Sequence, residues 1–254
     1  MQDFRRVREL EVISSKKVSN NMLRLSFYSK DLFDFSDKEK GGYVKLLFNQ
    51  MKNKSDKELL RPYTIRNFRK KELEIDIDFV THKESKGIAS TWASRAVTGD
   101  KIRISGPGAK QQLKNDRDWY FFIGDMSALP AISVNLETIS KDSKGIIIIQ
   151  VLSKFDIIKL EKPKNILLYW IVNPDERKSK NYLYKKVTSI KWLQGCPYVW
   201  GAGEFSDIKL LREYFLVKGL RKENMYLSSY WKIDSDQEEH KIIKKIDNIE
   251  WSKS

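Results

Sequence analysis

The hydrophobic pattern of this chain changes near Asp116, and that change constrains the fold more than any other feature of the sequence. Before it, apolar residues alternate with polar ones in short runs, and after it they form unbroken runs. An alternating run predicts a strand with one solvated face, whereas unbroken runs separated by helix-length segments predict a parallel sheet covered on both faces. Two domains of different architecture are therefore expected.

The first part of the chain, from Val7 to about Gly106, predicts an antiparallel β-barrel domain over residues 1–112. Its clearest strand is LEIDIDFV, where apolar and acidic residues alternate from Leu73 to Phe79. Several such runs, broken by charged turns, are typical of barrels and sandwiches. The runs are VRELEVISSKKVS, NMLRLSFYS, YVKLLF, RPYTIRNF, LEIDIDFV and KIRISGP.

The second part predicts an α/β domain with a parallel sheet over residues 117–234. Its unbroken apolar runs are WYFFIG at 119–124, GIIIIQVLS at 145–153, NILLYWIV at 165–172, PYVWGAG at 197–203 and NMYLSSYW at 224–231. The segments between them are long enough for helices that cross from strand to strand. A polar linker between about Gly108 and Arg117 separates the two domains. Residues 235–254 form a charged tail in which isoleucines recur at helical spacing, which predicts a terminal helix.

Composition excludes several classes of protein. The chain has 48 Lys and Arg against 34 Asp and Glu, a formal charge of +14, yet 41% of it is apolar, which argues against a disordered basic tail. A single cysteine, Cys196, cannot form an intramolecular disulfide, and with two histidines it leaves too few ligands for a structural zinc ion or an iron–sulfur cluster. No run is long enough for a signal peptide or a membrane span, so a cytoplasmic protein without stable membrane insertion and without a metal site is expected.

The first candidate motif is RPYTIR, from Arg61 to Arg66. Strand alternation places Arg61 and Tyr63 on one face beside the hydroxyl of Thr64. A guanidinium binds phosphate and an aromatic ring stacks on a planar cofactor. The same residues are also ordinary on the surface of a barrel strand.

The second motif is DFVTH, from Asp78 to His82, followed by GIASTW from Gly87. A strand ends there, a glycine turns the chain, and Ser90 precedes a short apolar helix. A helix start with free backbone amides and a serine can hold a pyrophosphate. A helix cap at Ser90 and an exposed histidine are the structural alternatives.

The third and fourth motifs follow unbroken strands. GDMSALPAI begins at Gly124 and leads into a helix with Pro130 in its first turn. YVWGAGE, from Tyr198 to Glu204, repeats this arrangement on a later strand. Doubly wound sheets bind nucleotides beyond the carboxyl ends of their strands, although neither segment is a G-x-G-x-x-G fingerprint and either is also an ordinary β-to-α turn.

Together and in this order, the four segments resemble the siderophore-interacting protein family, FAD-dependent ferric-siderophore reductases within the ferredoxin–NADP reductase superfamily. RPYTIR is similar to the family's flavin motif R-x-Y-T/S-x-R, and IDFVTH with GIASTW resembles its second FAD segment. GDMSALPAI resembles G-D-E-T-A-L-P-A-I, WGAGE resembles W-x-A-G-E, and SSYWK is similar to a C-terminal Y-W-R element. The resemblance runs from about Phe4 to Lys232.

The resemblance implies a flavin-binding barrel followed by a nicotinamide-binding domain. Tyr63 would pack against the isoalloxazine and Thr64 would bond near the flavin N5 edge, as the catalytic pair, while Arg61 would neutralise FAD phosphate. The remaining cofactor residues that it implies are Asp78, Val80, His82, Ala89 and Ser90 for FAD, and Gly124, Asp125, Ser127, Ala128, Gly203 and Glu204 for the nicotinamide dinucleotide.

The resemblance also implies the reaction. NADH or NADPH would give a hydride to FAD, and reduced FAD would pass single electrons to Fe(III) held by a siderophore. Hard oxygen donors hold Fe(II) less well than Fe(III), so reduction would release the iron. Met126 and Ser127 stand where the family has Glu-Thr, and SSYWKID lacks the glycine that commonly follows Y-W-R, which leaves the choice of dinucleotide and the C-terminal contact open.

Two other functions fit parts of the sequence, and a third, nucleic-acid binding, is suggested only by the positive charge. A flavin reductase could pass electrons to a ferredoxin or an oxygenase instead, and a siderophore-binding protein could lack redox activity. A nucleic-acid partner is not expected, because lysines and arginines are interspersed with acids and no nucleic-acid motif is present. The protein is expected to act as a monomer on a ferric siderophore, with ferredoxin as an alternative partner.

The excess of positive charge suggests steering of small anions. Residues 1–116 hold 25 basic and 16 acidic side chains (+9), and residues 117–254 hold 23 and 18 (+5). Ferric siderophores are often anionic, as are FAD and nicotinamide dinucleotides, so a positive cleft would attract all three. The candidate substrate contacts are Lys45, Arg66 and Lys232, for each of which a solvated surface lysine or arginine is the alternative.

Overall fold

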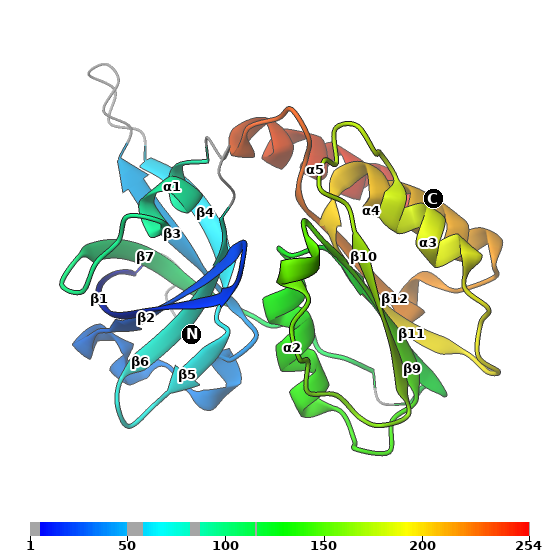
Figure 1. Cartoon of the computed structure of the whole chain (residues 1–254), viewed down its shortest axis with the longest axis horizontal. Coiled ribbons are helices and arrows are strands. Elements are labelled where there is room, and N and C mark those ends of the chain that lie inside the picture. Colours follow the sequence, from blue (N-terminus) through cyan, green and yellow to red (C-terminus); the bar gives the residue numbers. More distant parts are fainter. Residues whose placement is uncertain (1–5, 50–57, 82–86, 115, 254) are drawn as a thin grey trace. The chain divides into compact units, whose positions relative to one another are not determined.

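The computed structural model describes residues 6–49, 58–81, 87–114 and 116–253. The chain divides into two compact units, whose main boundary in the sequence lies between Gln112 and Leu113 (Figure 1). The short segments Ser133–Glu137 and Ile158–Leu160 group with the first unit. Within the described ranges, no helix combines the length and the apolar character needed to cross a membrane.

The first unit is built on one curled antiparallel sheet with the order β4-β3-β7-β1-β2-β6-β5. Its strands are β1 (Val7–Ser19), β2 (Met22–Tyr28), β3 (Tyr43–Asn49), β4 (Glu58–Thr64), β5 (Asn67–Arg69), β6 (Glu74–Val80) and β7 (Lys101–Gly108), and its helix is α1 (Ile88–Ala93). The sheet bends until the edge strand β4 reaches β6, where the rings of Tyr63 and Phe79 have centroids 4.5 Å apart. The predicted antiparallel barrel is confirmed.

Strand β6 departs from a half-buried strand, because its acidic face is also covered. Asp76 and Asp78 are only 5% and 8% exposed. Arg69 donates to Asp76 from both terminal nitrogens at 2.8 Å, and Arg24 donates to the two carboxylate oxygens of Asp78 at 2.6 and 2.8 Å. Burial by itself raises the pKa of Asp76, but the hydrogen bonds from Arg69 and Ser26 outweigh it and hold that pKa below its usual value.

The second unit is a parallel sheet with the order β10-β9-β8-β11-β12, as the unbroken runs predict. Its strands are β8 (Trp119–Gly124), β9 (Gly145–Val151), β10 (Ile166–Val172), β11 (Pro197–Glu204) and β12 (Met225–Trp231). Its helices are α2 (Leu129–Thr138), α3 (Tyr182–Ser189), α4 (Phe205–Val217) and α5 (Gln237–Lys253). Together with the first unit, this arrangement confirms the predicted fold class.

Helices cover both faces of this sheet. On one face, Phe121 and Ile123 of β8 are fully buried against Leu211 and Phe215 of α4, and α3 joins the same cluster. Helix α2 lies over the opposite face (Figure 1). Both faces are covered, which is why the strands can be apolar throughout.

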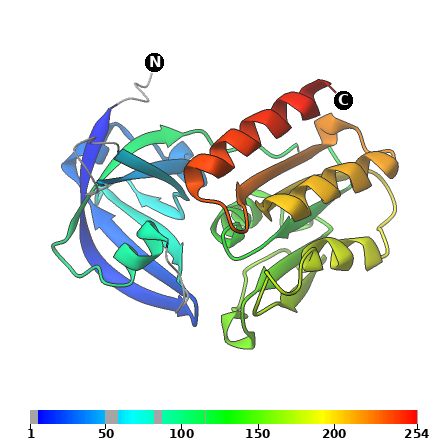
Figure 2. The same cartoon turned by 90° about the horizontal axis from the view of Figure 1, so that it is seen from above.

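Helix α5 runs beside β12 (Figure 2) and packs through polar groups. The His240 imidazole Nε2 lies 3.0 Å from the Ser229 hydroxyl, and Lys244 donates to the Ser229 carbonyl at 2.6 Å. Burial, with Lys244 and Lys232 nearby, lowers the pKa of His240 to about 4. Three of its isoleucines instead face solvent, with exposures of 62%, 53% and 46% for Ile242, Ile246 and Ile249.

Candidate functional site

The first four residues of the RPYTIR motif, Arg61 to Thr64, lie on β4, where strand pairing sets their register. Arg61 pairs with Leu46 of β3 and Tyr63 with Val44, so the two side chains share one face of the strand. Arg61 donates to the carbonyl of Leu60 at 3.1 Å. Burial raises the pKa of Tyr63, partly offset by the charge of Arg61, so its phenol stays protonated.

The second predicted FAD segment adjoins the first through a chain of aromatic rings. Tyr63 contacts Phe79, and Phe79 lies 6.3 Å from Trp92 of α1. Ala89 and Ser90, at the start of α1, are 5% and 8% exposed. The rings join β4, β6 and α1, so the structure brings the two motifs together.

The other predicted residues of the first unit occupy different settings. Asp78 is held by Arg24, which gives its carboxylate a structural partner. Lys45 is exposed on β3, and the Arg66 side chain is 19% exposed. His82 lies outside the described residues. Their roles at a cofactor or substrate remain predictions.

The chemistry gathered here fits FAD. Arg61 supplies a cation for phosphate, Tyr63 an aromatic ring, and Thr64 and Ser90 hydroxyl groups, while Val80 ends β6 half-buried. Ala89 and Trp92 belong to or pack against the apolar cluster of the barrel, so the floor beneath these groups is rigid. An aromatic plane with a neighbouring guanidinium is what a flavin with a pyrophosphate requires.

In the second unit, the predicted residue Asp125 follows β8 and has its carboxylate occupied. Its Oδ1 accepts hydrogen bonds from the Ser127 amide at 2.8 Å and hydroxyl at 2.5 Å, and its Oδ2 accepts from the Trp231 indole at 2.8 Å. A Cβ on Gly203 would lie 2.7 Å from that Oδ2, so the glycine makes room for the bond. Asp125 therefore ties the end of β12 to the end of β8.

The predicted residue Glu204, at the end of β11, also has both carboxylate oxygens occupied by hydrogen bonds. Its Oε2 accepts from the Ser206 amide at 2.5 Å and caps α4, and its Oε1 accepts from the Ile233 amide at 3.1 Å. Two carboxylates predicted to contact a dinucleotide thus hold the end of β12 and the segment directly after it.

The turn between β8 and α2 is closely packed. A Cβ on Gly124 would lie 2.6 Å from the Cβ of Ala128 and 3.0 Å from the Ala202 carbonyl, so only glycine fits. Helix α2 begins directly after Ala128 with Pro130 in its first turn. This turn has the tight geometry that lets a ligand approach backbone.

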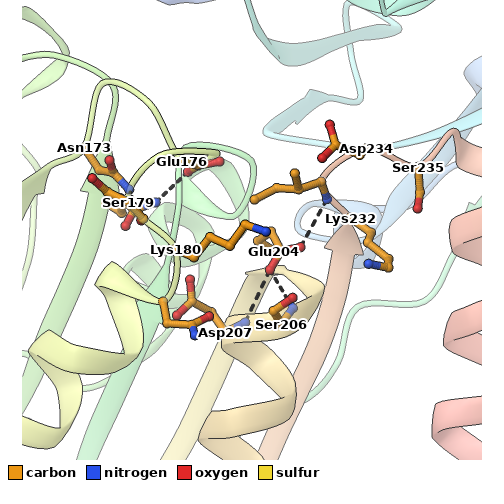
Figure 3. A pocket seen from close by; sticks show the side chains of 13 residues that line it. Asn173, Glu176, Ser179, Lys180, Glu204, Ser206, Asp207, Lys232, Asp234 and Ser235 are labelled. Carbon is orange, nitrogen blue, oxygen red and sulfur yellow. Dashed lines mark hydrogen bonds between the residues drawn. The ribbon is translucent and has the colours of Figure 1, made fainter.

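A cavity of about 260 Å³ opens at the carboxyl edge of this sheet (Figure 3). It brings together Glu204 and Lys232, which the sequence motifs indicate, with several residues that they do not. The lining residues are Gln150, Asn173, Glu176, Ser179, Lys180, Asn181, Glu204, Ser206, Asp207, Lys232, Ile233, Asp234 and Ser235.

The carboxylates in and near this cavity raise one another's pKa. Burial raises the pKa of Glu176 to about 8, and the charges of Asp125, Asp207 and Glu204 add to the rise. Burial also raises the pKa of Asp207 to about 6, although that residue accepts the Tyr184 amide at 2.9 Å. Within the described residues, no group of three His, Cys, Asp or Glu side chains is arranged to hold a metal ion.

Sequence reasoning missed Gln150, Glu176 and Asp207. One signal was available: Gln150 is the only polar residue in the run GIIIIQV, and it stands near the carboxyl end of the strand. A polar side chain buried in such a run needs a partner. Glu176 lies in a connection without periodicity and gives no comparable signal.

Comparison with known proteins finds a matching family model in each unit. A model described as "Siderophore-interacting FAD-binding domain" matches residues 50–111, and one described as "Siderophore-interacting protein" matches residues 117–234. Ferric vibriobactin reductase ViuB of Vibrio cholerae is 29% identical over 252 residues, covering 91% of each chain. The crystal structure of the siderophore-interacting protein SipS from Aeromonas hydrophila superposes with a TM-score of 0.83 at 29% identity, covering 96% of this chain and 98% of SipS.

The fold extends to more distant structures. The ferredoxin reductase of carbazole 1,9a-dioxygenase has a TM-score of 0.67 at 13% identity, covering 89% of this chain and 70% of that one. This likeness concerns the fold alone. The family models confirm the resemblance drawn from the motifs and the predicted FAD cofactor.

Proposed function

Because the chain belongs to the siderophore-interacting protein family, whose two models match its two units, we propose that it is a cytoplasmic flavoprotein that uses NADH or NADPH to reduce Fe(III) held by a siderophore. Two relatives bear on this: ViuB is named a ferric vibriobactin reductase, and SipS a siderophore-interacting protein. The observation that carries the proposal is the ring chain from Tyr63 through Phe79 to Trp92, which joins the two FAD motifs.

In the first unit, the chain's own residues would hold and orient the flavin. Arg61 offers its guanidinium to a phosphate, and Tyr63 offers a ring whose position is fixed by Phe79. Ser90 and the start of α1 offer hydroxyl and amide donors. Bound FAD would supply the exchange between paired and single electrons, since nicotinamide gives electrons in pairs and iron accepts one.

In the second unit, the cavity at the carboxyl edge of the sheet would hold the electron donor. It lies where doubly wound sheets bind nucleotides. Lys180 and Lys232 line it and provide positive charge that would attract the anionic dinucleotide. Asp125 and Glu204 would act by fixing the end of β12 and the segment directly after it, because their oxygens already accept hydrogen bonds from Trp231 and Ile233.

The test starts with the purified full chain and its flavin absorbance. NADH or NADPH is then added with a ferric siderophore and a ferrous trap, and formation of the ferrous complex is followed. Arg61→Met should lower FAD affinity by about tenfold or more, because it removes a charge-assisted contact worth roughly 1.5–3 kcal/mol. Arg95→Met, at an exposed position after α1, is the matched control and should leave FAD binding unchanged.

Two results would contradict the proposal. One is a protein that neither retains nor binds FAD. The other is a flavin-loaded protein that reduces a ferredoxin but forms no ferrous complex from ferric siderophores, which would favour electron transfer to a protein partner.

A further inference from the structure

One amide oxygen in the cavity of the second unit has no hydrogen-bond partner among the described residues. Gln150 is 3% exposed, and its Nε2 donates to Glu176 Oε1 at 2.5 Å, while its Oε1 is buried and unpaired. Exchanging the two amide atoms would leave the nitrogen unpaired instead. A buried polar atom without a partner costs stability unless a ligand satisfies it. The Gln150 amide therefore points to a ligand with a hydroxyl group.

The position of Gln150 indicates which part of a dinucleotide would supply that hydroxyl. Gln150 is at the carboxyl end of β9, Asn173 directly follows β10, and both strands lie on the same side of the first strand, β8. In a doubly wound sheet the pyrophosphate lies over the first strand, at the start of the next helix. The adenosine then lies over the strand that follows, and its ribose hydroxyls over the end of that strand.

The size of the cavity agrees with a partial ligand. About 260 Å³ is below the roughly 300–1,000 Å³ of pockets that enclose a whole small molecule. It suits one nucleoside half of a dinucleotide, with the rest of the molecule lying outside.

The charges beside Gln150 are unfavourable for a second phosphate. Glu176 and Asp207 line the same cavity, and the pKa of each is raised by burial and by neighbouring carboxylates. A 2′-phosphate carries about −1.5 to −2 charges at neutral pH. At pH 7.5 Asp207, with a pKa of about 6, is ionised, whereas Glu176, with a pKa of about 8, is largely protonated. Glu204, Asp234, Lys180 and Lys232 also line the cavity, and Asp234 pairs with Arg177 at 3.2 Å.

We propose that the Gln150–Glu176 pair binds the adenosine ribose hydroxyls and that this cavity selects NADH over NADPH. This inference rests on the proposed function, since it assigns the donor of that same reaction. The ionised carboxylate of Asp207 would repel a 2′-phosphate, whereas the unpaired acceptor of Gln150 favours a hydroxyl donor. Gln150 and Glu176 are thus residues that determine specificity and lie away from the reacting atoms.

Equilibrium binding of the oxidised dinucleotides to the flavin-loaded full chain tests this without turnover. By titration calorimetry at pH 7.5, NAD⁺ should bind about tenfold or more tightly than NADP⁺. Asp207→Asn should narrow that ratio at least threefold by removing a charge while keeping the oxygen that accepts the Tyr184 amide. Gln150→Leu should weaken NAD⁺ more than NADP⁺.

The matched control is Glu213→Gln on the exposed side of α4, which removes the same charge outside the cavity and should leave the ratio unchanged. Equal affinities, tighter binding of NADP⁺, or a ratio that Asp207→Asn does not alter would overturn the inference. A protein that reduces ferric siderophores equally well with NADPH would retain the proposed function and lose this inference. Failure of both dinucleotides to reduce the flavin would overturn the proposed donor as well.

Discussion

Buried and half-buried carboxylates in the two units have opposite surroundings. In the first unit, Asp76 and Asp78 each meet an arginine through two short hydrogen bonds. In the second, Glu176 and Asp207 meet an amide or a backbone group and also one another's charge. A paired buried charge serves the fold, whereas an unpaired one is retained at a cost to stability. The difference therefore indicates where a ligand is expected.

The largest change in the free energy of unfolding is expected from breaking an arginine–aspartate ion pair in the first unit. Arg69→Met leaves the Asp76 carboxylate buried without its guanidinium, and should lower the free energy of unfolding by about 2–3 kcal/mol at pH 7. The cost is below that of a wholly buried pair because the Arg69 side chain is 31% exposed. Urea denaturation of the full chain measures it, and adding Asp76→Asn should recover part of the loss.

The pH dependence of this pair has a definite sign. The folded-state pKa of Asp76 is lowered, so the stability it contributes is present above the unfolded pKa of about 3.8 and is lost as pH falls through the lower folded value. The gap between wild type and Arg69→Met should therefore shrink in acid. A gap that stays constant down to pH 2 would mean that the guanidinium acts through packing alone.

In the second unit, the pH dependence of the stability that a carboxylate contributes has the opposite sign. The pKa of Glu176 is raised from 4.5 to about 8, so its contribution is complete below pH 4.5 and is lost as pH rises through 8. Glu176→Gln should be more stable than wild type by about 1–2 kcal/mol at pH 9 and should match it at pH 4.5. Thermal unfolding at the two pH values measures this, and equal curves at pH 9 would place Glu176 in solvent.

His240 should have a smaller effect on how stability depends on pH. Its pKa is lowered to about 4, so the stability from keeping it neutral is present above pH 6.5 and is lost as pH falls towards 4. Wild type should lose about 1 kcal/mol more than His240→Gln over that interval. Hydrogen exchange of the α5 amides would localise the loss, and a loss spread evenly over the second unit would contradict it.

The smallest change in the free energy of unfolding is expected at an exposed carboxylate, which belongs to neither group of carboxylates compared above. Glu213 is an exposed carboxylate on α4, and Glu213→Gln should change the free energy of unfolding by less than about 0.5 kcal/mol at any pH from 5 to 9. A larger change would show that general surface charge, and not the surroundings of each carboxylate, governs the pH responses above. The same urea titrations provide the measurement.

The strands could be predicted because their periods are local properties of the sequence. WYFFIG and GIIIIQV form β8 and β9, because strands of a parallel sheet covered on both faces accommodate unbroken apolar runs. The terminal isoleucines carried a weaker signal. Three of them point outwards, because α5 is held by His240 and Lys244, and periodicity alone does not reveal which face a helix buries.

The site was partly predictable for a related reason. Motifs placed Asp125 and Glu204 at strand ends, but the bonds of these residues go to Trp231 and Ile233, and for Asp125 that partner lies 106 positions away. Such pairings depend on how strands are ordered in the sheet, which no single motif encodes. Glu176 became relevant only through the fold, since the connection after β10 brings it to Gln150.

The hydrogen bonds from Trp231 and Ile233 also imply an order in which the two sheets are completed during synthesis. A nascent chain that has not yet released β12 from the ribosome carries Asp125 and Glu204 with their local donors from Ser127 and Ser206, but without those from Trp231 and Ile233. The seven strands of the barrel all precede β8 in the sequence. The sheet of the second unit should therefore become complete later in synthesis than the sheet of the barrel.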